Sequence, residues 1–142
     1  MSRSLSLRFA SDRFDRDSEL PTHYNAGNRF YGRDLAEYLA GALSARGLPA
    51  EMLDEDWGWL VFATRESGED FEVAVYLLSD EDDPAPPGAD WGLWVRAHER
   101  RRLLGLVPRR VEIPVPPHVE AAVRDAVHAL GATPRPWDDG PD

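Results

Sequence analysis

Apolar and polar residues alternate in four stretches of the chain, residues 4–9, 57–65, 71–78 and 91–97. This alternation predicts four strands, because successive side chains of a strand point to opposite faces of a sheet. Residues 66–70 include a glycine and have a length suited to the loop of a hairpin between the second and third strands. Residues 99–110 follow neither the two-residue period of a strand nor the roughly 3.6-residue period of a helix clearly. They fit a short helical turn or an edge ribbon.

Two other stretches have the period of an amphipathic helix. The first is expected to start near residue 33 and to end before Gly47. Its apolar stripe consists of Leu35, Leu39 and Leu43. The second is expected to begin at Pro116 and Pro117 and to end before Gly131. The order β-α-β-β-β-α predicts an α+β fold, with two helices packed on one face of an antiparallel sheet of about four strands.

The 142 residues are expected to form one domain, 1–142. Within it, residues 11–30 are predicted to form a long irregular loop, 79–90 an acidic proline-rich loop, and 132–142 an irregular tail. The chain has no cysteine, which excludes disulfides and thiolate ligands and fits a reducing compartment. It has no signal-peptide pattern and no run of about 18 apolar residues, so we expect a cytoplasmic protein without a membrane partner.

The three central strands have one strongly apolar face, which is the expected seat of both helices. The opposite face is also rich in apolar residues, with Glu72, Thr64 and Arg96 at its edges. Its apolar members are Leu60, Phe62, Ala74, Tyr76, Leu78 and Trp94. Either the 11–30 loop or the tail with Trp137 covers this face, or a partner or second copy does. In the second case Phe62, Tyr76 and Trp94 are exposed in the monomer or buried in a homodimer.

Acidic residues are concentrated in the middle of the chain. Residues 49–90 contain 13 Asp or Glu and one Arg, and the whole chain has a net charge of −10. This balance opposes nucleic acid binding, because that affinity comes mostly from cations on phosphates. It favours a protein partner with basic groups.

The acids next to aromatic residues are the first candidates for a binding surface. Asp54, Glu55 and Asp56 precede Trp57 and Trp59, an arrangement suited to mimic phosphates toward an arginine-rich partner, or to protect an apolar strand from aggregation. Acids of the proline-rich loop are expected to extend this surface. The predicted binding residues are Asp54, Glu55, Asp56, Trp57, Trp59, Asp80, Asp82, Phe62, Tyr76 and Trp94.

Five arginines lie close together in the sequence, at positions 100–102, 109 and 110. They are suited either to contact phosphate or RNA, or to neutralise the acidic loop. Because the whole chain is acidic, we interpret them as neutralising that loop.

The sequence contains no recognisable catalytic or metal-binding motif. The four histidines lack metal-ligand spacing, and the run Asp80-Glu81-Asp82-Asp83 fails as a calcium loop because Pro84 follows and the required glycine is missing. We therefore expect no metal, no cofactor and no catalytic residue. The alternative is a small hydrolase or nucleotide-handling enzyme that uses His23 as a general base.

The segments NRFYGRDLAEYLAGALSARG and LDEDWGWLV, within residues 28–62, carry a family resemblance. They resemble small stand-alone bacterial proteins in which a GRDLAEYL helix leads into an EDWGW strand, a functionally uncharacterised group. The resemblance implies no catalytic residues. In size, acidity and layout the chain is also similar to immunity proteins that neutralise bacterial toxins, which is an analogy of architecture.

Together these features predict a non-enzymatic cytoplasmic domain that binds a protein partner through an acidic and aromatic surface. A homodimer through the second sheet face is one form of this prediction, and an immunity or antitoxin-like protein that neutralises a basic effector is an alternative.

Overall fold

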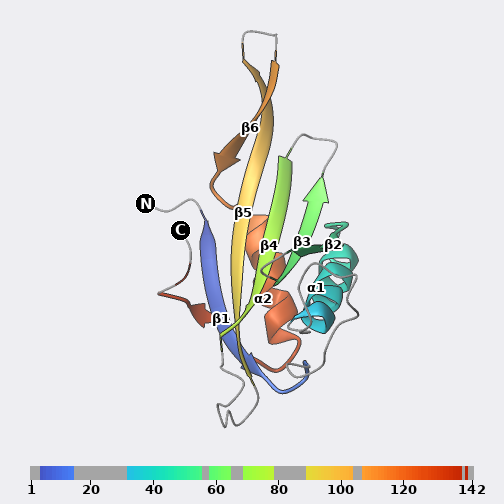
Figure 1. Ribbon diagram of the computed structural model, residues 1–142, viewed down its shortest axis with the longest axis vertical. Helices are drawn as coiled ribbons and strands as arrows, with labels where there is room; N and C mark the ends of the chain where they lie inside the picture. The colour runs from blue at the N-terminus through green and yellow to red at the C-terminus, as the bar shows by residue number, and fades with distance from the viewer. Residues whose placement is uncertain are drawn as a thin grey trace.

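The structure, a computed structural model, describes residues 4–14, 32–55, 58–64, 69–78, 89–103, 107–138 and 140. It contains two helices and seven strands (Figure 1). In chain order these are β1 (Leu5–Ser11), α1 (Arg33–Ala45), β2 (Glu51–Glu55), β3 (Gly58–Thr64), β4 (Glu69–Leu77), β5 (Ala89–Leu103), β6 (Val107–Ile113), α2 (Pro117–His128) and β7 (Arg135–Pro136).

All seven strands belong to one antiparallel sheet, in which six follow the order β2-β3-β4-β5-β1-β7 and β6 pairs with β5 outside this order. The long strand β5 pairs with β4 along one edge, and with β1 and then β6 along the other. The prediction of an α+β fold with an antiparallel sheet is confirmed, but about four strands was too few.

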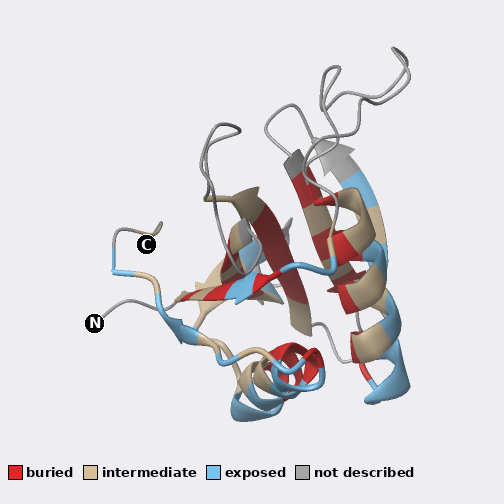
Figure 2. Ribbon diagram, turned by 90° about the horizontal axis from the view of Figure 1, so that it is seen from below, coloured by how far each residue is buried: buried red, intermediate tan, exposed pale blue. Residues whose placement is uncertain are grey.

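Both helices pack on one face of this sheet, where their apolar stripes meet the inward side chains of the strands. Figure 2 shows the buried residues of the helices turned toward the strands. The predicted apolar face is largely buried here, and its members include Trp59, Val61, Phe71, Val73, Val75, Trp91, Leu93 and Val95. The helices also contact each other, because the Tyr38 hydroxyl donates a 2.6 Å hydrogen bond to the carbonyl of Ala126.

The start of α1 depends on a glycine. Gly32 is the N-cap residue with φ of +93°, a left-handed conformation that costs residues with a Cβ roughly 1–2 kcal/mol. A Cβ at this position would also lie 2.9 Å from Cγ1 of Val75 in β4. The predicted end of the helix is confirmed, since Arg46 follows the last helical residue and Gly47 has φ of +83°.

Three strands were missing from the sequence prediction. β2 has only two apolar residues, Met52 and Leu53, among acids, so its alternation is too short to identify. β6 and the second half of β5 are rich in arginine, and the structure resolves the ambiguous segment as a ribbon. β7 has two residues in the segment expected to be irregular, and it exists only because β1 lies beside it.

The β5–β6 ribbon extends beyond the rest of the sheet (Figure 1). The last residue of β5 that pairs with β4 is Glu99, opposite Glu69. From Arg100 to Leu103, β5 pairs among the described strands only with β6. We call this two-stranded part, Arg100 to Leu103 with Val107 to Arg110, the arm. Four residues of strand give it a length of about 13 Å.

Candidate protein-binding face

The second face of the sheet is not covered by either helix. Its side chains alternate with the buried set, so register places Leu53 of β2 beside Leu60 of β3, and Ala74 of β4 beside Trp94 of β5. We call the apolar residues of this side the helix-free face: Leu53, Leu60, Phe62, Ala74, Tyr76, Leu78 and Trp94. Leu53 is 44% exposed, the largest exposure of a large apolar side chain among the described residues.

The tail covers one end of the helix-free face. The backbone N–H of Trp137 donates to the carbonyl of Ser6 in β1, and its ring packs against Tyr76 with ring centroids 5.5 Å apart. Gly92 makes room for this ring, because a Cβ there would lie 2.7 Å from it. Of the two cases that the sequence left open for this face, cover by the chain's own tail therefore holds at Tyr76, and exposure or burial by a second copy does not.

The centre of the helix-free face is bordered by an ion pair. Arg96 of β5 pairs with Glu72 directly opposite on β4, and the Glu72 side chain is only 11% exposed. The guanidinium carbon of Arg96 also lies 4.0 Å from the centroid of the Trp94 ring, a cation–π geometry. Trp94 is therefore half-buried and held in place by a charged neighbour. Burial and Glu72 raise the pKa of Tyr76, while Arg96 opposes this.

Toward the arm, the same side of the sheet becomes charged. Asp70 faces His98 across β4 and β5, and Glu112 faces His98 from β6. Arg100 lies 3.9 Å from Asp70. Burial lowers the pKa of His98, and the positive field of Arg110 lowers it further. The imidazole therefore lies between arginines and carboxylates at the base of the arm, and Glu72 and Glu112 oppose the effect of Arg110 and Arg96 on its pKa.

A shallow surface hollow adjoins the opposite edge of the helix-free face. It has a volume of about 470 Å³ and lies where the end of α1 meets the start of β2. Its lining consists of Ser44, Pro49, Ala50, Glu51 and Phe62. Phe62 is half-buried and Glu51 is exposed, so the hollow combines an aromatic wall with an acidic rim.

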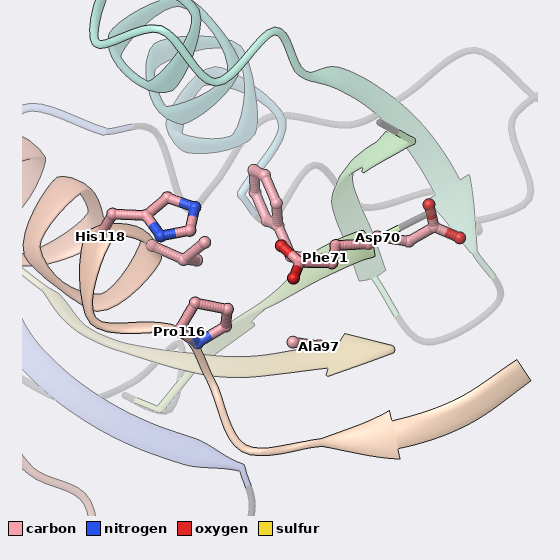
Figure 3. A pocket seen from close by; sticks show the side chains of 7 residues that line it. Asp70, Phe71, Ala97, Pro116 and His118 are labelled. Atoms are coloured by element: carbon pink, nitrogen blue, oxygen red, sulfur yellow. The ribbon is translucent and has the colours of Figure 1, made fainter. Parts of the chain in front are cut away.

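A second hollow lies at the start of α2 and is much smaller (Figure 3). His118 and Pro116 meet Phe71 and Ala97 there, and the volume is about 10 Å³, enough for a single water molecule. The carboxylate of Asp70 points away from His118 in Figure 3, so these two side chains do not form an acid–base pair.

The predicted binding residues are separated by the fold. Trp59 belongs to the core and is 3% exposed, so its ring is not available to a partner. The backbone of Asp54 and Glu55 lies in β2 rather than in a connection before a strand. Phe62, Tyr76 and Trp94 share the helix-free face, as their alternation predicts. Asp56, Trp57, Asp80, Asp82 and His23 lie outside the described residues.

Leu53 and Glu51 escaped sequence reasoning, because they belong to the unrecognised strand β2. The tail with Trp137 was named from the sequence as one of the alternatives for covering the face, but the contact of Trp137 with Gly92 was not predicted. The glycine inside an otherwise apolar strand was the one available signal, because such a residue often marks close approach by another group.

Two further observations concern ligands and membranes. Among the described residues, His, Asp and Glu nowhere gather in a group of three suited to hold a metal ion. Of the described helices, neither has the length and apolar character needed to cross a bilayer.

No protein family model, curated protein or solved structure matches this chain.

Proposed function

We propose that this protein is a non-enzymatic, cytoplasmic domain that binds a protein partner on the helix-free face, at its β2 edge. The observation that carries the proposal is the uncovered apolar surface around Leu53, which is 44% exposed, and Phe62, which forms the wall of the adjoining hollow. An apolar centre with a polar border is the usual composition of a protein interface.

The charges beside this surface favour a partner with basic groups. Glu51 is exposed at the rim of the hollow, and Asp54 and Glu55 follow it in the same strand. Carboxylates form their strongest hydrogen bonds with arginine, whose planar group matches them in a bidentate manner. The partner is therefore expected to place arginine or lysine beside β2 and an apolar group against Phe62.

The edge position of β2 supports the same location. β2 pairs with β3 along one side, and no other described strand pairs with it. Glu51 is exposed on this strand, and a charged side chain at an edge protects it from uncontrolled strand addition, while Leu53 remains accessible. A partner with complementary charge overcomes this protection, and an acidic or neutral strand does not.

The experiment is a pull-down from the native host with tagged protein, followed by a binding measurement with the purified partner. Leu53→Arg places a cation in the proposed interface, and Ala121→Arg makes the same change at an exposed site of α2. We expect one stoichiometric partner that is retained by Ala121→Arg and weakened about 10-fold or more by Leu53→Arg, as for an interface hot spot.

A second variant tests the charge component. Neutralising Asp54, Glu55 and Asp56 to Asn or Gln is expected to weaken the same partner while the far-UV circular dichroism stays unchanged. If both variants bind as the unmodified protein does, the β2 edge is not the interface. If sedimentation shows that the partner is a second copy of the chain, the proposal of a basic partner is overturned in favour of a homodimer through the helix-free face.

A further inference from the structure

The arm brings arginines together across its two strands. Arg100 lies directly opposite Arg110 in register, and Arg101 lies directly opposite Arg109. Like charges directly opposite each other destabilise a strand pair. A two-stranded ribbon is only marginally stable in water, and the arm has no third described strand to support it. The register therefore places like-charged residues opposite each other where only two described strands form the sheet.

The acidic proline-rich loop lies outside the described residues, and its two described ends lie far from the arm. It joins Leu78 to Ala89, and these ends lie together because the Leu78 N–H donates a 2.9 Å hydrogen bond to the Asp90 carbonyl. Arg101 is twelve residues further along β5 than Ala89, a distance of about 40 Å. The interpretation that the arginines neutralise this loop falls on acids outside the described residues and stays a prediction.

The acids at the base of the arm neutralise the positive charge of its arginines only in part. Asp70 lies 3.9 Å from Arg100, and Glu112 lies near His98. Arg109 and Arg110 are both exposed, and neither forms an ion pair with a side chain that the structure describes. Arg110 also lowers the pKa of His98, which shows that its positive field reaches the neighbouring strand.

We propose that the arm binds an acidic segment of a protein partner, whose carboxylates bridge the opposed arginines of β5 and β6. Residues 100–110 contain five Arg and no acid, so with a net charge of −10 for the whole chain the remaining residues sum to −15. A nucleic acid duplex carries a negative charge about every 1.7 Å along its axis. Its length brings further phosphates beside the acidic rest of the chain, which repels them. A short acidic segment meets the arm alone, since charges beyond about 8–10 Å are screened at physiological salt.

This proposal does not depend on the function of the β2 edge. The edge is expected to attract basic groups, whereas the arm attracts acidic ones. Substitutions in β2 and substitutions in the arm therefore test the two sites independently.

The first test measures binding of a fluorescein-labelled peptide of twelve glutamates to the full chain by anisotropy in 50 mM NaCl. We expect saturable binding that disappears in 500 mM NaCl. The double variant Arg109→Glu/Arg110→Glu is expected to bind about 10-fold or more weakly, the loss typical of charge-assisted hydrogen bonds. The charge-matched control is Arg13→Glu, which is compared with the single variant Arg110→Glu. Arg13 is exposed and follows β1 at the other end of the sheet.

The second test measures hydrogen exchange of the arm amides without ligand. Arg109→Glu places a carboxylate opposite Arg101, which converts a repulsive cross-strand pair into an attractive one. We expect exchange in residues 100–103 to slow about 1.5- to 5-fold, the factor that corresponds to a cross-strand charge pair. The same substitution thus stabilises the free arm and weakens binding, a combination that a purely structural arginine does not produce.

Several results would overturn the proposal. The first is absence of peptide binding in 50 mM NaCl. The second is an equal loss of peptide affinity in Arg13→Glu and Arg110→Glu. The third is faster amide hydrogen exchange of residues 100–103 in Arg109→Glu. A 12-base-pair DNA duplex that binds more tightly than the peptide, with the same arginine dependence, would assign the arm to nucleic acid. A dimer in sedimentation that Arg109→Glu dissociates would assign it to a second copy of the chain.

Discussion

Trp137 packs against Tyr76 with ring centroids 5.5 Å apart and an angle of 61° between the rings. The two residues are 61 positions apart in the chain, and Gly92 on the strand between them leaves the space that the indole fills. The contact fixes the tail to the sheet and limits the open part of the helix-free face to the side of β2 and β3. This contact and three others lead to measurable predictions.

Gly92→Ala is expected to destabilise the protein by about 1–3 kcal/mol, because its methyl group would overlap the Trp137 ring. Urea unfolding measures this difference. In the Trp137→Ala background the ring is gone, so adding Gly92→Ala is expected to have little further effect. Equal costs of Gly92→Ala in both backgrounds would show that the glycine is needed for another reason.

Glu72→Gln is expected to lower the free energy of unfolding by about 1–2 kcal/mol, because it removes a charge from a pair with little solvent screening. The matched control is Glu120→Gln in α2, whose pair with Arg124 at 2.9 Å is more exposed. That change is expected to cost less than about 0.5 kcal/mol. Thermal unfolding of both variants makes the comparison, and similar costs would contradict the role assigned to burial.

His98 is expected to make the protein less stable in mild acid. Burial, then Arg110, lowers its pKa in the folded state below the ordinary value of 6.5, against the opposing effect of Glu72. The unfolded chain therefore takes up the proton first, so this stability is present above pH 6.5 and is lost as pH falls through the folded-state pKa.

His98→Gln removes this contribution and leaves the carboxylates unchanged. The loss of unfolding free energy between pH 7.5 and pH 5.5 should then be smaller in the variant than in the unmodified protein. Denaturant unfolding at the two pH values provides the measurement. An identical loss in both proteins would mean that His98 is not responsible.

Two glycines near α1 are expected to respond in opposite ways to alanine. Gly32→Ala forces a Cβ into a left-handed conformation and against Val75, at a cost of about 2 kcal/mol or more. Gly41→Ala lies inside the helix with no atom within 4 Å of the new Cβ, and should stabilise by about 0.5–1 kcal/mol. Differential scanning calorimetry of the pair tests this, and the same sign for both would refute the assigned roles.

The sequence alone predicted the parts of this protein that depend on local periodicity. The stripe Leu35, Leu39 and Leu43 identified α1, and the alternation in β3, β4 and β5 separated the helix-covered face from the helix-free face. It also grouped Phe62, Tyr76 and Trp94 correctly on one side. These predictions succeed because the side-chain period of a helix or strand is fixed by its backbone geometry.

Only the tertiary structure decided which segments meet. β2 and the arm have too few apolar residues for a period. β2 is a strand because β3 pairs with it, and the arm is a ribbon because the second half of β5 pairs with β6. The tail reaches Tyr76 because β7 pairs with β1, and the arm lies far from Ala89, where β5 begins, because β5 has 15 residues. Such contacts depend on register between distant strands, and local sequence carries no information about the distance that a strand places between two charges.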